Sequence, residues 1–93
     1  MKIAVVALGK IGLPLAVQFA NKGHHVIGCD VNQKAVDLIN AGTEPFPGEA
    51  HLDEYLKKNI ASGHLVATTN TKSAVAQCEA VVVVVPLLSL IHI

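Results

Sequence analysis

The feature that most constrains the fold of this chain is a set of short apolar runs that alternate with segments of helical spacing. The runs at residues 2–7 and 80–85 are apolar at nearly every position, which is typical of strands buried on both faces of a sheet. A helical pattern separates each run from the next, and strands joined through helices run parallel. The sequence therefore predicts an α/β fold built around a parallel sheet.

The expected elements follow from apolar spacing and from the glycines that end helices. Because crossovers between parallel strands are right-handed, the four strands are expected in the order 3-2-1-4, as part of a Rossmann-type doubly wound sheet. Asn32 is expected to cap the second helix. Leu52, Leu56 and Ile60 are expected to form the core face of the third helix. Strands are predicted at residues 2–7, 25–29, 65–68 and 80–85, and helices at 12–22, 32–41, 51–61 and 71–78.

Composition excludes several classes of function. With 93 residues the chain forms at most one small domain, and 52% hydrophobic residues make disorder unfavourable. Seven lysines balance seven carboxylates and arginine is absent, so the chain offers no basic surface to nucleic acid. The longest apolar run, residues 80–91, is shorter than the ~20 residues that span a bilayer. The N-terminus enters a strand without a signal-peptide pattern, so we expect a cytoplasmic protein that binds neither nucleic acid nor membrane.

The cysteines and histidines show no metal-binding or redox spacing. Cys29 and Cys78 lie far apart in the sequence and are expected to be reduced thiols, with a disulfide as the alternative. His24 and His25 are expected to be a surface pair on opposite faces of a strand, because no third ligand accompanies them. No metal site is expected.

The turn after the first strand, residues 7–12, has the spacing of a dinucleotide-binding fingerprint, with Ala7 in place of the first glycine. Gly9 would let a diphosphate approach the backbone, and Gly12 would let the helix pack against the strand. Because the N-terminus of a helix favours negative charge, this turn is expected to bind a pyrophosphate. Alanine at position 7 costs little if its φ is negative and roughly 1 kcal/mol if its φ is positive. A tight strand-to-helix turn without a ligand is the alternative.

Asp30 ends the second strand, 21 residues after Gly9. A carboxylate at this place accepts hydrogen bonds from the hydroxyls of an adenosine ribose. It also repels a 2′-phosphate, and the chain has no arginine to neutralise one. The expected cofactor is therefore NAD rather than NADP.

Four segments, GKIGLPLA at 9–16, VIGCDVNQ at 26–33, EPFPGE at 44–49 and TT at 68–69, carry a resemblance to a known family. They resemble the UDP-glucose/GDP-mannose dehydrogenase family, and within it the UDP-N-acetyl-D-mannosamine dehydrogenase branch. The most specific is Leu13-Pro14, directly after the last glycine of the turn, because most Rossmann-type enzymes lack this pair. The likeness covers roughly residues 1–87.

The resemblance implies an activity and a set of site residues. The family oxidises the C6 alcohol of a nucleotide sugar to a carboxylate in two NAD-dependent steps, which gives a UDP-uronic acid for surface polysaccharide. In this chain the backbone of residues 8–12 would contact the pyrophosphate, Asp30 the adenosine ribose, and the loop at Pro86 the side of the cofactor. Lys10 replaces the usual tyrosine, and Leu87 stands where many members have threonine. The implied cofactor-binding residues are Leu8, Gly9, Lys10, Ile11, Gly12, Asp30 and Pro86.

The resemblance also implies that much of the enzyme lies beyond these residues. The family's nucleophilic cysteine, its lysine and asparagine helpers and its sugar-binding domain lie downstream, and neither Cys29 nor Cys78 matches the nucleophile. Residues 1–87 are therefore expected to be a truncated NAD-binding domain without catalytic residues, inactive alone. Its full-length parent would be a homo-oligomer acting on a UDP-sugar, in particular a UDP-N-acetylhexosamine. Residues 88–93 are expected to be a non-native tail, because their back-translation reads like a transposase adapter; a natural apolar C-terminus is the alternative.

Two other functions stay open on the sequence. An NAD(H)-sensing regulatory module would share the turn and Asp30, but it would not need Leu13-Pro14 or the loop at residues 44–49. A 6-phosphogluconate-type dehydrogenase would favour NADP, with basic residues after the second strand, which the sequence lacks.

Overall fold

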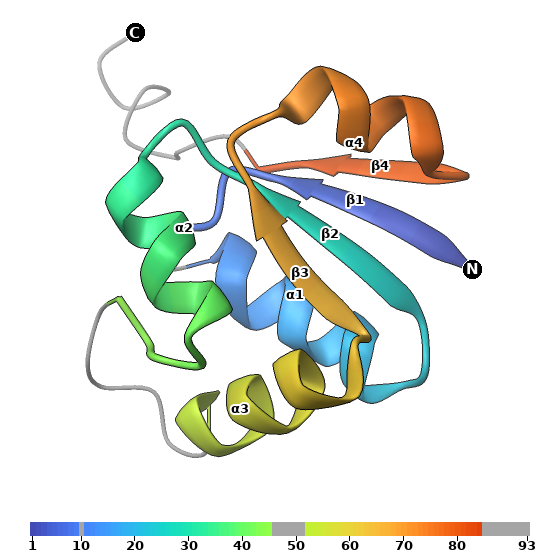
Figure 1. The fold of residues 1–93 in the computed structure, drawn as a ribbon. Coiled ribbons are helices and arrows are strands. Elements are labelled where there is room, and N and C mark those ends of the chain that lie inside the picture. Colours follow the sequence, from blue (N-terminus) through green and yellow to red (C-terminus); the bar gives the residue numbers. More distant parts are fainter. Residues whose placement is uncertain (10, 46–51, 85–93) are drawn as a thin grey trace, which may run out of the picture.

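The computed structural model describes residues 1–9, 11–45 and 52–84. These residues form a parallel sheet in the order β3-β2-β1-β4, with helices between successive strands (Figure 1). The predicted α/β class and strand order are confirmed. The strands are β1 (Lys2–Val6), β2 (His25–Cys29), β3 (Leu65–Thr68) and β4 (Ala80–Val83), and the helices are α1 (Gly12–Asn21), α2 (Gln33–Asn40), α3 (Leu52–Ser62) and α4 (Thr71–Gln77).

Helices α1, α2 and α3 lie on one face of the sheet, and α4 lies on the other (Figure 1). The main core fills the three-helix side, where Leu13 and Leu56 are fully buried in one cluster with Val5 of β1. On the other side, Ala4 and Ala74 are buried where α4 packs on β1 and β2. All the strands run parallel, so their carboxyl ends lie on one side of the sheet. The turns that enter α1, α2 and α4 follow these carboxyl ends and therefore lie close together, as in other sheets of this class.

The helix ends follow the predicted signals. Asn32 caps α2, with its Oδ1 accepting a hydrogen bond from the Ala35 N–H at 3.2 Å. Gly23 and Gly42 follow α1 and α2 with φ of 97° and 80°, the left-handed conformation that favours glycine. The first helix ends one residue earlier than predicted, and the third ends one residue later.

Strand β4 is less buried than a strand apolar on both faces was expected to be. Ala80 and Val82 pack against the core, but Val81 and Val83 are 42% and 62% exposed. The described helix on that face, α4, packs on β1 and β2 and leaves the outward side chains of β4 uncovered. The strand also ends at Val83, so the prediction that it reaches residue 85 was wrong at Val84; residue 85 lies outside the described residues.

The outer edge of β3 is covered by a side chain of α2. Asn40 Nδ2 donates to the Ala67 carbonyl at 2.9 Å, and the Ala67 N–H donates to Asn40 Oδ1 at 2.9 Å. The side-chain amide thus satisfies both backbone groups of one edge residue, in the way that a neighbouring strand would.

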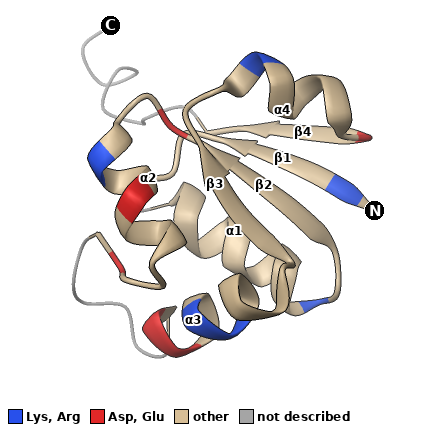
Figure 2. Cartoon of the chain, viewed as in Figure 1, with Lys and Arg blue, Asp and Glu red and all other residues tan. Residues whose placement is uncertain are grey.

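The molecular surface carries mixed charge. Figure 2 shows acidic and basic positions on the outer side of α3. Among these, Lys57 Nζ lies 3.6 Å from Asp53 Oδ2, the i,i+4 spacing of a helical ion pair. A contact that the sequence did not predict is the stacking of the His25 and His64 rings, with centroids 5.1 Å apart. None of the helices in the described part of the chain is long and apolar enough to cross a membrane.

Candidate dinucleotide-binding site

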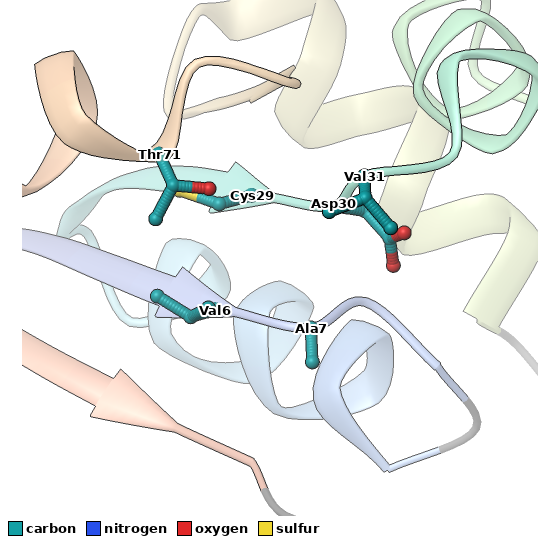
Figure 3. Close-up of a pocket in the computed structure, with 6 residues that line it drawn as sticks. All are labelled: Val6, Ala7, Cys29, Asp30, Val31 and Thr71. Atoms are coloured by element: carbon teal, nitrogen blue, oxygen red, sulfur yellow. The ribbon is translucent and has the colours of Figure 1, made fainter.

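A cavity of about 130 Å³ lies where the strands β1 and β2 end. Figure 3 shows its walls coming from three places in the sequence: the end of β1, the end of β2 and the first residue of α4. It occupies the place where open parallel sheets bind their ligands, outside the carboxyl ends of the strands. The lining residues are Val6, Ala7, Cys29, Asp30, Val31 and Thr71.

The turn between β1 and α1 is held in a strained conformation at its first residue. Ala7 has a φ of 79°, which ends β1 at Val6, one residue before the predicted end. An L-residue in this region costs roughly 1 kcal/mol relative to glycine. The Ala7 N–H donates to the Cys29 carbonyl at 2.7 Å, so β2 holds the strained residue in place. Ala7 therefore has the positive φ that costs free energy, rather than the negative φ that an alanine adopts freely.

The two glycines of the turn have different surroundings. A Cβ on Gly12 would overlap the carbonyl oxygen of Ala7, so only glycine allows α1 to start this close to the end of β1. A Cβ on Gly9 would meet no heavy atom of the described residues within 4 Å. The packing of these residues therefore does not require glycine at position 9, and the space they leave beside it suits a ligand that approaches the backbone.

Asp30 connects the turn at α1 to the turn at α2. Its Oδ2 accepts a hydrogen bond from the Leu8 N–H at 2.9 Å, and its Oδ1 accepts one from the Asn32 N–H at 3.0 Å. Each carboxylate oxygen has a second lone-pair direction for another donor. The carboxylate is therefore fixed in orientation at the rim of the cavity and retains capacity to accept hydrogen bonds from a ligand.

The start of α1 has no side-chain cap. Its N-cap residue, Ile11, has no acceptor, and the first turn contains no acidic residue. The N–H groups of a helix start need acceptors, and together with the helix dipole they favour an anion. An uncapped helix start beside a carboxylate-rimmed cavity suits a ligand that carries both phosphate and ribose.

Comparison with known proteins identifies the fold as that of one enzyme family. Residues 1–87 match the model of the UDP-glucose/GDP-mannose dehydrogenase family, NAD binding domain. The chain belongs to this family. NAD is the cofactor of this domain.

Relatives of this NAD-binding domain include enzymes for several nucleotide sugars. UDP-N-acetyl-D-mannosamine dehydrogenase of Salmonella typhimurium is 46% identical over 79 residues, which is 85% of this chain and 19% of that protein. GDP-mannose 6-dehydrogenase of Azotobacter vinelandii is 35% identical over 85% of this chain and 18% of its own length. The chain thus spans about one fifth of the length of these relatives.

Solved structures of the family superpose closely on this domain. GDP-mannose dehydrogenase from Pseudomonas aeruginosa, in a ternary complex, has a TM-score of 0.88 and 35% identity over 92% of this chain and 20% of that chain. UDP-D-ManNAc dehydrogenase from Pyrococcus horikoshii has a TM-score of 0.85 and 33% identity over 91% of this chain and 20% of that chain.

The geometry of the NAD-binding domain fits NAD at three points. Gly12 allows the close start of α1, Gly9 leaves open space beside the turn, and Asp30 is fixed at the rim of the cavity. Leu8, Gly9, Ile11, Gly12 and Asp30 lie together at the carboxyl end of the strands, and their contacts with the cofactor stay a prediction. Lys10 and Pro86, the other predicted site residues, lie outside the described residues.

Four residues around the cavity were missed by the sequence reasoning: Val6, Cys29, Val31 and Thr71. Val31 follows Asp30 and is 92% exposed, and this exposure cannot be read from the sequence. Thr71 could have been found, because it starts the helix after β3 and parallel strands place such starts at one edge.

The surroundings of Cys29 favour a packing role for its thiol in the cavity wall over a role as a nucleophile. Cys29 is fully buried, and both cysteines are free thiols, as expected. Burial raises the pKa of Cys29 above its ordinary value and nearby Cys78 raises it further, while a hydrogen bond with Thr71 lowers it. A raised pKa keeps the sulfur protonated, which makes it a poor nucleophile.

Proposed function

We propose that this chain is the NAD-binding part of a nucleotide-sugar 6-dehydrogenase that acts on a UDP-N-acetylhexosamine. The enzyme would oxidise the C6 alcohol of the sugar to the uronic acid used in polysaccharide biosynthesis. The relative named for UDP-N-acetyl-D-mannosamine supports this substrate class, with 46% identity against 35% for the GDP-mannose enzyme of Azotobacter vinelandii. The observation that carries the proposal is the Asp30 carboxylate, fixed beside an uncapped helix start.

The residues of this domain would bind and orient the cofactor. The pyrophosphate would lie over the backbone of Leu8, Gly9, Lys10, Ile11 and Gly12, at the positive end of α1. The Leu8 N–H already donates to Asp30, so Leu8 would act on the cofactor through that carboxylate. Asp30 would accept hydrogen bonds from the ribose hydroxyls and would disfavour the 2′-phosphate of NADP.

NAD, when bound, supplies the acceptor for the hydride that leaves the sugar C6. The loop at Pro86 would lie alongside the cofactor. The sugar site and the nucleophile would be carried by the part of the enzyme that follows in the longer relatives, so we propose that these 93 residues do not turn over substrate alone. We further propose a cytoplasmic enzyme that is a homo-oligomer at full length and binds neither nucleic acid nor membrane.

Calorimetric titration of NAD and NADP into the chain tests cofactor binding. We expect NAD to bind, NADP to bind at least tenfold more weakly, and Asp30→Ala to remove most of this difference. Equal affinity for both cofactors in the parent chain would contradict the role of Asp30.

A turnover assay tests the proposal that this domain binds NAD but does not catalyse the reaction alone. NADH formation would be followed at 340 nm with NAD and either UDP-N-acetylmannosamine, UDP-glucose or GDP-mannose. We expect no activity from these 93 residues, and activity would overturn that proposal. DNA that continues the reading frame after Leu87 into a glycine-rich segment with the family's cysteine would support the enzyme.

A further inference from the structure

The next-to-last residue of β2 is a glycine, Gly28, that the cofactor fingerprint does not explain. Glycine weakens a strand and often marks the close approach of another group. Here that group is Leu8: a Cβ on Gly28 would lie 2.7 Å and 2.8 Å from the two Leu8 methyl carbons and 3.3 Å from its Cγ. Leu8 is only 1% exposed, so its side chain lies in the packed core and has little free space to move aside.

Leu8 is also the residue whose N–H donates to Asp30. The turn is therefore attached to the last two residues of β2 and to the residue that follows it. The Leu8 side chain packs on Gly28, the Ala7 N–H donates to the Cys29 carbonyl at 2.7 Å, and the Leu8 N–H donates to Asp30 at 2.9 Å. Two of these contacts are hydrogen bonds, which require donor and acceptor within a few tenths of an ångström of these distances. The distance between the Leu8 side chain and the backbone of β2 therefore determines whether both hydrogen bonds can form.

We propose that Gly28 is a positioning residue for cofactor binding, which acts through Leu8. By accepting the Leu8 side chain at its backbone, Gly28 holds the β1–α1 turn at the distance at which Asp30 is oriented by the Leu8 N–H. A side chain at position 28 would lift the turn from β2 and release the carboxylate that faces the adenosine ribose. This inference rests on the proposed NAD site, and it adds a residue outside the fingerprint to that site.

The test compares NAD affinity with stability in four chains. Gly28→Ala is the variant, and Gly28→Ala/Leu8→Val is the rescue, since valine removes a methylene where the new Cβ enters. Val26→Ile is the matched control, because it adds one methylene to the same buried face of the same strand, two residues farther from the turn. Calorimetry gives the dissociation constants for NAD and for ADP, and circular dichroism gives the melting temperature without ligand.

We expect Gly28→Ala to weaken NAD and ADP binding by about five- to tenfold, because the affected contacts lie on the adenosine side. Val26→Ile should bind both as the parent does, and the double variant should recover NAD affinity to within about twofold. Parent-like NAD affinity in Gly28→Ala, or an equal loss in Val26→Ile at a similar melting temperature, would overturn the proposal.

Two further outcomes separate this inference from the proposed function. A parent chain that binds no NAD contradicts the proposed function itself, whereas a parent that binds NAD and a Gly28→Ala that binds equally well contradicts only the positioning role. If Gly28→Ala does not fold, the single variant Leu8→Val is the test. It removes side-chain atoms that pack on Gly28 and should weaken NAD binding severalfold. Unchanged NAD binding in Leu8→Val would contradict the positioning role of Gly28.

Discussion

The turns that lead into α1 and α4 lie at the same edge of the sheet but satisfy their backbone groups differently. At α4, Asn70 Oδ1 accepts from the Ser73 N–H at 3.1 Å, and Thr68 Oγ1 accepts from the Asn70 N–H at 3.0 Å. At α1 the N-cap residue is Ile11, which has no side-chain acceptor. A helix start that carries its own acceptors needs no ligand, whereas an uncapped one offers its N–H groups to an anion. Under the proposed function, the turn at α4 serves folding alone, whereas the turn at α1 also binds the pyrophosphate.

Gly12→Ala should have the largest effect on the binding turn. The new Cβ would overlap the carbonyl oxygen of Ala7, a backbone atom that cannot rotate aside, so α1 must move away from β1. We expect the free energy of unfolding to fall by about 3 kcal/mol. Urea denaturation followed by circular dichroism measures this loss.

Gly9→Ala is the matched control for that change. Among the residues that the structure describes, its Cβ would meet no atom within 4 Å, so stability should stay within about 0.5 kcal/mol of the parent. NAD affinity, measured by calorimetry, should nevertheless fall more than tenfold, because the methyl occupies the space beside the pyrophosphate. An equal loss of stability in both variants would contradict the distinction between the two glycines.

Adding a side-chain acceptor at the start of α1 and removing the one at the start of α4 tests the comparison directly. Ile11→Asp places a negative charge at the start of α1, where it repels the pyrophosphate, so NAD affinity should fall about tenfold, or about 1.4 kcal/mol. Asn70→Ala should cost about 1 kcal/mol of stability through the lost cap and leave NAD affinity unchanged. Weakened NAD binding in Asn70→Ala would show that the turns are not specialised in this way.

Ala7→Gly should stabilise the binding turn by a smaller amount. Glycine removes the cost of the positive φ but adds entropy to the unfolded chain, so we expect a net gain of about 0.5 kcal/mol. Ala4→Gly, in the regular part of β1, should instead lose about 1 kcal/mol. Denaturation midpoints of the two variants would move in opposite directions, and a shift of both to lower urea would show that Ala7 is not strained.

The smallest expected effect is the pH dependence from Cys29. Its pKa is raised in the folded state, so its contribution to stability is fully present below the ordinary thiol pKa of 9.0 and is lost as the pH rises through the folded value. Cys29→Ala should therefore flatten the fall in stability above pH 9.0, measured by denaturation at several pH values. Parallel curves for the parent and the variant would contradict this assignment.

Much of this fold could be predicted because its signals are local. The strand order follows from right-handed crossovers between apolar runs, and Asp30 was placed correctly because a carboxylate that ends a strand must lie at the edge where the strands end. The Asn32 cap was also found, since an asparagine before a helical pattern needs no tertiary information.

The contacts within the site could not be predicted because they depend on distances between segments. The sign of the Ala7 φ, the packing of Leu8 on Gly28 and the hydrogen bond from Leu8 to Asp30 all arise where β1 and β2 meet. The exposure of Val83 depends on where α4 packs, and no pattern within β4 contains that information.

The amide of Asn40 has a consequence for how copies of this domain behave in a crowded cell. Strand β3 ends the sheet, and an open strand edge is a template on which other chains can add strands and polymerise. By pairing with both backbone groups of Ala67, the Asn40 amide takes the place that one residue of an added strand would occupy. Asn40, a residue of helix α2, therefore opposes the addition of a strand at this position of the sheet edge.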